Sequence, residues 1–468
     1  MHFLVQFTDG DAGNLNGKSK LYFSMGLRFI FFVAVCILGF CSMLGFTYAQ
    51  VFHTPLNLSN EIRDSREPHI AVSGKNVYVI WTGFGMGVED QDDIFFKKSS
   101  NAGGNFSDTI NLSNNIGSSF NPKLAVSGTN VYVIWQDDTG NTGNTSIFFQ
   151  KSSDSGTTFT PTINLSNDSG FAIDPQLSLF GNMIHVIWQD DTSGPDDILY
   201  KRSSDGGSSF SEIMNISKSL DTDSLDGEIY AINNMVYIVW TEGNFDQGRT
   251  SIFARASSDS GAIFGQAINL SENSGDAIMP RVSAFGNNEY VLWMQGKFNQ
   301  GEILFKKSPD NGTTFGQTIR LSNDAGNDNG TSSNPLLFVD DKYVYTVWLN
   351  NETNKANAYL RTSLDDGATF ENVKNLSQGT FGVSNPAISG NKSSIYVVWE
   401  EEEESPTGSD IAIKKSNDAG VTFGHTISLG KSSDFPSYPA ISVYDNKSYI
   451  VWQDSTNGTD QIRFTRER

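Results

Sequence analysis

Residues 122–135, with the sequence Pro-Lys-Leu-Ala-Val-Ser-Gly-Thr-Asn-Val-Tyr-Val-Ile-Trp, decide the fold of this chain. Positions 131–135 are apolar throughout, a pattern typical of a strand that is covered on both faces. The turn 128–130 joins this segment to an earlier strand at 122–126. Two further strands are expected at 146–151 and 162–166, after a polar loop and a Gly-rich turn. The stretch therefore predicts one sheet of four short strands, which we call A to D, joined by hairpin-type turns.

This unit recurs along the chain. All eight tryptophans occupy the last position of strand B, spaced 51 to 55 residues apart, at Trp81, Trp135, Trp188, Trp240, Trp293, Trp348, Trp399 and Trp452. A sheet whose second strand is apolar on both faces needs a neighbouring sheet on each side. Repeated four-stranded units of this length are typical of β-propeller blades, so we expect the tryptophans to pack between blades.

The two ends of the repeat predict how the ring closes. The eighth unit reaches Phe464 and Thr465 and stops before its fourth strand. Near the beginning, the segment Thr-Pro-Leu-Asn-Leu-Ser at 54–59 resembles the strand D segment Thr-Pro-Thr-Ile-Asn-Leu-Ser at 160–166. We therefore predict an all-β propeller of eight blades, with seven as the fallback, closed by the N-terminal strand. Residues 50–468 form this single domain.

Residues 1–49 are predicted to be an N-terminal extension with a signal peptide or signal anchor. The apolar run 29–49 follows Lys18, Lys20 and Arg28 and ends in a small-x-small site at Thr47-Tyr48-Ala49. Its length also suits an uncleaved membrane anchor. Either Met1 or Met25 can serve as the start. Both interpretations predict a secreted or cell-surface protein.

The composition excludes several classes of partner. The formal charge of −21 disfavours nucleic acid and anionic membrane surfaces and favours cations or basic surfaces. The two cysteines, Cys36 and Cys41, precede the repeats, so the propeller has neither a disulfide nor a thiolate metal site. Many Asn-x-Ser/Thr sequons, several within the repeated strand D text, predict a glycoprotein in a host that glycosylates them.

A short acidic turn follows strand C in seven units, with the form Ser-x-Asp-x-Gly-x-x-Phe. Its acidic position is occupied by Asn101, Asp154, Asp205, Asp259, Asp310, Asp365 and Asp418. This turn resembles the Asp-box (BNR) repeat of the sialidase-like superfamily, with Phe in place of the more usual Trp. We expect a structural role, because a short acidic side chain can accept hydrogen bonds from the amides of its own turn.

The resemblance also implies what an enzymatic site would need. Sialidases use three arginines for the substrate carboxylate, a Tyr–Glu nucleophile pair and an aspartate acid/base. Arg66-Glu67-Pro68 stands where their Arg-Ile-Pro motif opens the first blade. If the chain is an enzyme, the candidates are Arg66, Asp90, Glu228, Arg281 and Tyr438. A convincing third arginine is absent, and six blades are usual for that activity, so we expect a non-catalytic protein.

The loops between strands B and C are acidic. They carry Glu89, Asp90, Asp92 and Asp93, then Asp137 and Asp138, Asp190 and Asp191, Asp196 and Asp197, and Glu400 to Glu404. We expect a solvated, solubilising rim, with a bound calcium ion as the alternative because oxygen ligands suit Ca²⁺. The sequence contains no dedicated calcium motif, no metal ligand can be assigned, and no cofactor is required.

A candidate ligand site lies on strand A, the strand expected nearest the central channel. The residue that follows its proline, or Gly227 in the fourth unit, is polar or charged in five consecutive units and apolar in the other three. The polar positions are His69, Lys123, Gln176, Glu228 and Arg281. We call these five residues the polar arc and predict that they bind a ligand at the channel mouth. The alternative is ordinary wetting of a water-filled channel.

The predicted function is that of an extracellular or cell-surface recognition propeller that binds a glycan, a protein or a cation through its loop-rich face. A sialidase-like glycoside hydrolase and a structural envelope component are the alternatives.

Overall fold

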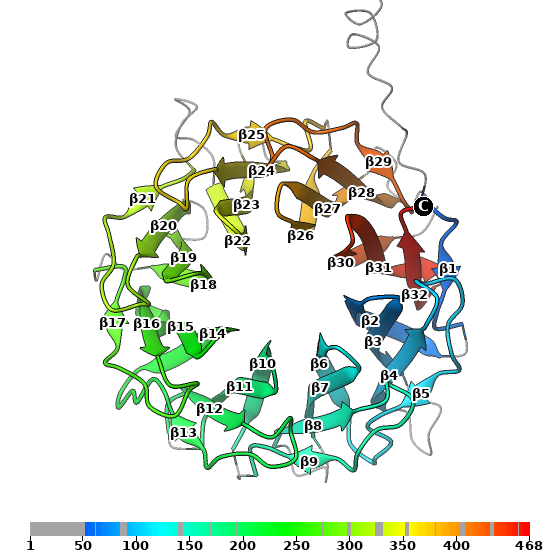
Figure 1. Cartoon of the computed structure of the whole chain (residues 1–468), viewed down its shortest axis with the longest axis horizontal. Coiled ribbons are helices and arrows are strands. Elements are labelled where there is room, and N and C mark those ends of the chain that lie inside the picture. Colours follow the sequence, from blue (N-terminus) through cyan, green and yellow to red (C-terminus); the bar gives the residue numbers. More distant parts are fainter. Residues whose placement is uncertain are drawn as a thin grey trace, which may run out of the picture. The chain divides into compact units, whose positions relative to one another are not determined.

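The computed structural model describes residues 52–60, 62–84, 91–138, 144–167, 170–192, 194–272, 276–296, 301–322, 331–351, 355–379, 381–402, 408–430, 435–456 and 458–468. These residues form eight antiparallel sheets of four strands each, arranged as a ring around a central channel (Figure 1). The eight-bladed propeller is therefore confirmed and the seven-bladed fallback is excluded. The predicted signal segment, both cysteines and Met25 lie outside the described residues.

Each blade runs from the channel outwards. The innermost strands, A, are β2 (Arg63–Ser73), β6 (Ser119–Ser127), β10 (Ala172–Phe180), β14 (Asp223–Ile232), β18 (Ala277–Phe285), β22 (Thr331–Asp340), β26 (Val383–Asn391) and β30 (Pro436–Tyr444). The B strands are β3 (Asn76–Phe84), β7 (Asn130–Asp137), β11 (Met183–Asp190), β15 (Met235–Asn244), β19 (Asn288–Gln295), β23 (Tyr343–Asn351), β27 (Ser394–Glu402) and β31 (Lys447–Thr456). We number the blades 1 to 8 in this order.

The outer two strands complete each blade. The C strands are β4 (Asp92–Ser99), β8 (Ser146–Ser152), β12 (Asp197–Ser203), β16 (Arg249–Ser257), β20 (Glu302–Ser308), β24 (Ala356–Ser363), β28 (Ser409–Ser416) and β32 (Thr459–Arg466). The D strands are β5 (Ile110–Asn111), β9 (Ile163–Asn164), β13 (Met214–Asn215), β17 (Ile268–Asn269), β21 (Ile319–Arg320), β25 (Lys374–Asn375), β29 (Ile427–Ser428) and, for blade 8, β1 (Leu56–Asn57).

The ring closes as predicted, through the N-terminal strand. Strand β1 pairs antiparallel with β32, with Leu56 opposite Phe464. The backbone amide of Leu58 donates to the carbonyl of Ile462 at 2.8 Å, and that of His53 donates to the carbonyl of Arg466 at 3.0 Å. Blade 8 is thus built from both ends of the repeat, and no C strand is left with a free edge.

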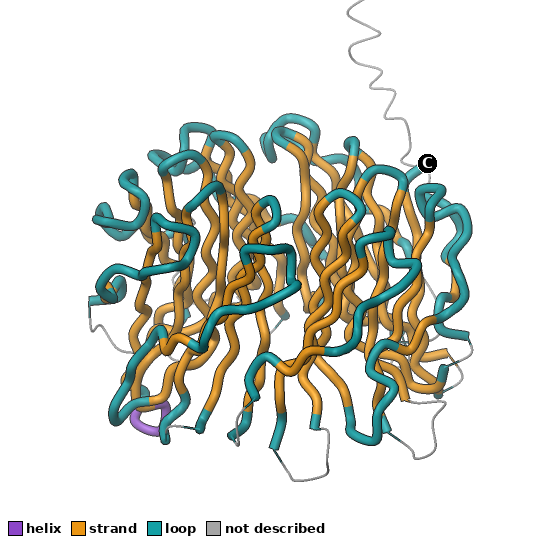
Figure 2. Tube along the Cα trace, turned by 60° about the horizontal axis from the view of Figure 1, so that its bottom comes forward, coloured by secondary structure: helices purple, strands orange, loops and turns teal. Residues whose placement is uncertain are grey.

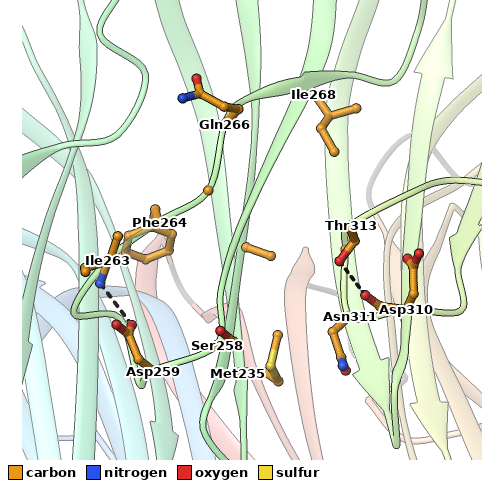
Figure 3. Close-up of a pocket in the computed structure, with 13 residues that line it drawn as sticks. Met235, Ser258, Asp259, Ile263, Phe264, Gln266, Ile268, Asp310, Asn311 and Thr313 are labelled. Atoms are coloured by element: carbon orange, nitrogen blue, oxygen red, sulfur yellow. Dashed lines mark hydrogen bonds between the residues drawn. The ribbon is translucent and has the colours of Figure 1, made fainter.

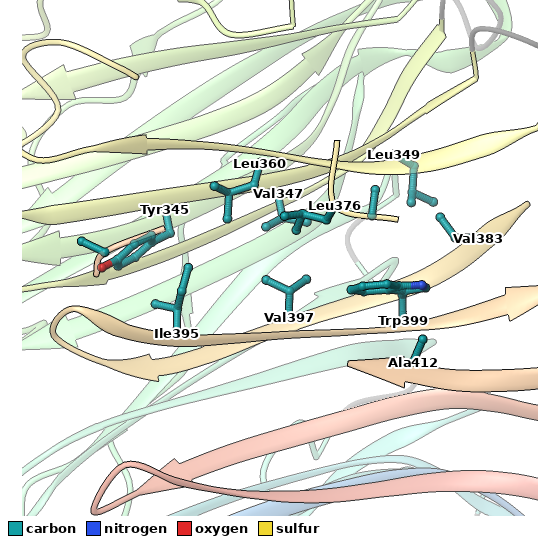
Figure 4. Close-up of a cluster of buried hydrophobic side chains, with 12 residues drawn as sticks. Tyr345, Val347, Leu349, Leu360, Leu376, Val383, Ile395, Val397, Trp399 and Ala412 are labelled. Carbon is teal, nitrogen blue, oxygen red and sulfur yellow. The ribbon is translucent and has the colours of Figure 1, made fainter. Parts of the chain in front are cut away.

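The core lies between blades. One buried cluster joins Val347 on β23 and Leu360 on β24 of blade 6 to Val397 and Trp399 on β27 of blade 7 (Figure 4). All eight tryptophans are at most 1% exposed, which confirms that they pack between blades. Burying both faces of the B strands in this way removes a large apolar area from water.

The propeller has two different ends. One carries the B–C loops, including the short 3-10 helix η1 (Phe245–Gln247), and we call it the loop face (Figure 2). The other, the turn face, carries the tight A–B turns and the C–D turns. Within the described ranges the structure holds no helix with the length and hydropathy of a membrane span.

Candidate functional site

Every inner strand is interrupted by a bulge close to the loop face. In β6, for example, Asn121 and Pro122 have no partner on β7, and the register shifts between Phe120 and Lys123. The first bulge residue of each blade has a left-handed backbone, with φ between 47° and 56°. These residues, which we call the bulge ring, are Glu67, Asn121, Asp174, Asp226, Met279, Asn334, Asn385 and Tyr438.

The left-handed conformation is costly for residues other than glycine, and Asn and Asp tolerate it best. Five of the eight bulge-ring residues are Asn or Asp. Bulges redirect side chains and are common beside binding sites. Their repetition in all eight blades places one strained residue per blade around the channel, whose wall the A strands form (Figure 1).

Hydrogen bonds connect part of the bulge ring from blade to blade. The backbone amide of Asn121 donates to Glu67 Oε2 at 3.0 Å, and Asn121 Nδ2 donates to Asp174 Oδ1 at 2.9 Å. Farther round the channel, the amide of Met279 donates to Asp226 Oδ2 at 3.4 Å. The acidic bulge residues are therefore fixed in position by their neighbours in the next blade.

The polar arc lies immediately beside this ring, on β2, β6, β10, β14 and β18, and all five of its residues are half-buried. Arg281 Nη1 forms an ion pair with Glu228 Oε1 at 3.1 Å across blades 5 and 4. Lys123 is close enough to both of these residues to interact with them electrostatically. Gln176 stands between Lys123 and Glu228 in the order of the blades.

Burial controls the charge of two members of the arc. Desolvation lowers the pKa of His69 to about 3, with a smaller contribution from the charge of Lys123, so His69 is neutral at pH 7. Desolvation also lowers the pKa of Lys123, while the carboxylates of Glu228, Asp174 and Glu67 oppose that shift. The structure thus brings His69, Lys123, Glu228 and Arg281 into one electrostatic network.

The described part of the channel mouth has an excess of negative charge. Its carboxylates are Glu67, Asp174, Asp226 and Glu228, against the two cations Lys123 and Arg281. Burial raises the pKa of Asp174; the charge of Lys123 opposes that shift, and the charge of Asp226 adds to it. An acidic mouth repels anionic ligands and attracts neutral, hydroxyl-rich or cationic ones.

The remaining three blades form a less polar side of the mouth. Leu336, Ala387 and Ala440 take the place of the polar arc there. Tyr438, the bulge-ring residue of β30, is 57% exposed. The mouth therefore combines a charged side with one exposed aromatic ring.

Of the residues suggested for sialidase chemistry, the four that the structure describes do not come together as one site. Tyr438 lies on blade 8 and Glu228 on blade 4, on opposite sides of the channel, so they do not form a nucleophile pair (Figure 1). Arg66 Nη2 is bonded to Asp92 Oδ2 at 2.5 Å. Asp90 lies outside the described residues. Among the four members of this set that the structure describes, Glu228 and Arg281 form the one hydrogen-bonded pair.

The acidic B–C loops differ from the prediction of a solvated rim. Asp93, Asp137, Asp190 and Asp197 are buried. Asp137 Oδ2 accepts hydrogen bonds from Trp135 Nε1 at 3.1 Å and from Ser119 Oγ at 2.6 Å. The prediction was wrong for these four residues because the loop carboxylates satisfy buried donors of the blade.

Calcium remains without a located site. Among the residues that the structure describes, no three His, Cys, Asp or Glu side chains are grouped as metal ligands would be. Glu89, Asp90, Glu403 and Glu404 lie outside those residues.

The seven Ser-x-Asp turns all lie on the turn face, away from this mouth. In blade 2, Ser152 Oγ accepts the amide of Gly156 at 2.8 Å and donates to Asp154 Oδ1 at 2.7 Å. Asp154 Oδ1 also accepts the amide of Thr158 at 2.9 Å, and such hydrogen bonds lower its pKa. The Phe that ends the turn, Phe159, packs edge-on against Phe96 of the preceding blade at 5.0 Å.

Several sequon asparagines are part of the framework. The side-chain carbonyl oxygens of Asn111, Asn164, Asn215, Asn269 and Asn375 each accept the backbone amide three residues later. The serine of the same sequon accepts a C-strand amide, as Ser166 Oγ does from Ile147 at 3.1 Å. These contacts explain why the Asn-x-Ser text recurs in strand D.

Comparison with known proteins adds only the fold. No model of a protein family matches the chain, and no curated protein matches its sequence. Among solved structures, the polysaccharide lyase Uly1 has a TM-score of 0.50 and 10% sequence identity, over 91% of this chain and 94% of that one. A sialidase from Trypanosoma rangeli has a TM-score of 0.41 and 10% identity, over 89% of this chain but 58% of that one. The NanB sialidase from Streptococcus pneumoniae has a TM-score of 0.35 and 12% identity, over 90% and 70%. What the chain shares with Uly1 is the β-propeller fold.

Proposed function

We propose that this protein is a non-catalytic recognition propeller of the cell surface or extracellular space, which binds a glycan at the channel mouth on the loop face. The observation that carries the proposal is the convergence of the polar arc with the bulge ring. Planar carboxylates and amides can each bond two neighbouring sugar hydroxyls, and an exposed ring such as Tyr438 can stack on the apolar face of a sugar. The seven Ser-x-Asp turns, which we assign to the Asp-box type, provide the rigid frame.

The charge of the mouth selects among glycans. Four carboxylates against two cations favour neutral sugars or amino sugars over sialosides and uronides. The distance between blades 4 and 8 also argues against a nucleophile pair of Tyr438 and Glu228. Both features support recognition rather than sialidase chemistry.

A glycan array tests the proposal. The wild-type protein is expected to bind neutral glycans or glycans that contain amino sugars. Glu228→Gln and Arg281→Ala should each weaken this binding at least tenfold. Ser153→Ala, an exposed position on the turn face, is the matched control and should bind normally. Binding should also survive EDTA. Glycan binding that is unaffected by both mouth substitutions would refute the assigned site.

The second candidate is a sialidase-like glycoside hydrolase, for which the observation is Arg66-Glu67-Pro68 at the start of blade 1. A fluorogenic sialoside and a broader glycoside panel should show no turnover. Turnover that Arg66→Ala abolishes would replace the recognition function by this enzymatic one.

A further inference from the structure

Basic side chains cross between neighbouring blades on the turn face. The residue just before the first position of the C–D turn is Lys or Arg in six of the eight blades, and in five of these its side chain bonds the next blade. We call such a side chain the arm of its blade. Lys151 Nζ, for example, donates to the carbonyl oxygen of Gly206 and to Ser208 Oγ, both at 2.8 Å. Equivalent contacts to the next blade are made by Lys98, Arg202, Lys415 and Arg466.

The basic side chain is missing in two blades, because the equivalent residue is Ala256 in blade 4 and Thr362 in blade 6. Thr362 is 1% exposed and lies against Gly420 of the blade 7 turn, so it fills that junction. Ala256 is too short to do the same. A groove of about 680 Å³ lies where the arm would be, between the C–D turns of blades 4 and 5 (Figure 3). Ala256 lines it together with Asn311 and Thr313 of the blade 5 turn. The missing side chain therefore leaves an accessible space at this junction.

The acceptors that the arm would use are present in the groove. Gly206 and Ser208, which receive Lys151, correspond in the repeat to Asn311 and Thr313. Thr313 Oγ1 donates to the backbone carbonyl of Asp310 at 2.7 Å. In blade 2 the equivalent Thr157 Oγ1 donates to the carbonyl of Asp154 at 2.8 Å and also accepts a hydrogen bond from Lys98. A hydroxyl that donates once keeps lone pairs for an incoming ammonium group.

The rest of the groove suits a long cationic side chain. Met235, Phe264 and Ile268 give it apolar walls, and Ile263, which is 72% exposed, stands on the blade 4 side (Figure 3). In five of the other turns the residue equivalent to Ile263 is Ser or Thr, and its hydroxyl donates a hydrogen bond to the carboxylate of the turn aspartate. Ile263 cannot form this bond. Apolar walls of this kind cover the methylene stem of a lysine.

The charge around the groove is negative. Asp259 and Asp310 line it, and no Lys, Arg or His does. Behind it, Glu289 is 1% exposed, and a Cβ added at Gly312 would overlap its carboxylate. Both carboxylate oxygens of Glu289 lack a hydrogen-bond partner among the described residues. Burial raises the pKa of Glu289 to about 8, so at pH 7 the negative potential comes from Asp259 and Asp310. These two carboxylates favour a cation in the groove.

We infer that this groove binds a lysine side chain from an exposed segment of a partner protein, which supplies in trans the arm that blade 4 lacks. The ammonium group donates to the Asn311 carbonyl and to Thr313 Oγ1, and the stem lies along Ile263. This surface is separate from the channel mouth, so it is independent of glycan binding.

Titration calorimetry at 150 mM salt tests the inference with the blocked peptide Gly-Ser-Lys-Ser-Gly. We expect one saturable site, no binding of the same peptide with norleucine in place of lysine, and at least tenfold weaker binding by Ala256→Lys, whose own side chain fills the groove. Thr313→Ala, which removes the hydroxyl acceptor without adding bulk, should also weaken peptide binding. This variant tests the same site if Ala256→Lys does not fold.

A gain-of-site variant completes the test. Lys151→Ala should open an equivalent groove between blades 2 and 3 and raise the number of bound peptides from one to two. Peptide binding that is unchanged in Ala256→Lys and Thr313→Ala overturns the inference, as does equal binding of the norleucine peptide. Binding of n-pentylamine as tight as that of the peptide would overturn the assignment to a protein lysine and leave a site for small amines.

Discussion

Glu289 occupies a position where six of the other seven B strands carry Val or Ile. Desolvation raises the pKa of this buried carboxyl group from 4.5 to about 8. The folded protein therefore holds a proton that the unfolded chain releases above pH 4.5, and the free energy of unfolding falls as pH rises towards 8. The half-buried His69 and the buried His185, with pKa values lowered to about 3 and about 4, act in the opposite direction only below pH 6.5. Above pH 6.5 neither histidine contributes to the pH dependence, and the difference between wild type and a Glu289 variant reports on the glutamate alone.

We predict that the wild-type protein loses roughly 2 kcal/mol of stability between pH 6.5 and 8 through Glu289, since one pKa unit corresponds to about 1.4 kcal/mol. Glu289→Val should remove this dependence and raise the thermal midpoint at pH 9. Glu371→Gln, at an exposed position, is the control and should behave as wild type. Denaturation at a series of pH values checks this, and parallel curves for wild type and Glu289→Val would contradict it.

At the scale of the element, the C–D turn depends on its buried serine. Ser152 is 1% exposed and accepts the amides of both Gly156 and Asp154. Ser152→Ala should cost about 1–3 kcal/mol, because it leaves the buried Gly156 amide without a partner. The adjacent exposed Ser153, changed to Ala, should cost almost nothing. Urea denaturation of the two variants measures the difference, and equal midpoints would show that the serine is dispensable.

The turns and the strands could be predicted from the sequence because each is encoded locally, by an apolar run or by a Ser-x-Asp-x-Gly text. The bulge ring could not, because Glu67, Met279 and Tyr438 give no local sign of a left-handed backbone. The only available signal was the frequency of Asn and Asp before the strand A proline. Likewise, the loop aspartates were expected in solvent because their partners, such as Ser119 for Asp137, come from another strand.

For the whole molecule, the eight regularly spaced tryptophans predicted the number of blades. The eighth unit, which lacks its fourth strand, predicted how the ring closes, because a closed ring must pair its two ends. The convergence of the polar arc could be predicted from the same geometry, because equivalent positions of successive blades face one channel. The groove at Ala256 could not be foreseen from blade 4 alone. It becomes visible only when the arm of each blade is compared with the turn that it reaches in the next.

Ring closure leads to the last prediction, which concerns a variant that lacks residues 1–60. Its strand β32 loses the partner strand β1 and the buried Leu58, which is 3% exposed. Loss of one large buried side chain costs about 2–5 kcal/mol, so the thermal midpoint should fall by roughly 5 °C or more. The free edge should also promote aggregation. A synthetic peptide of residues 52–60 should restore the midpoint in a concentration-dependent manner, because a ligand that binds only the folded state stabilises it. The same peptide with Leu58→Ala should restore much less, since the buried contact with the last blade is missing. A truncated protein with the same thermal midpoint as the wild type would mean that the pairing of β1 with β32 does not stabilise the ring.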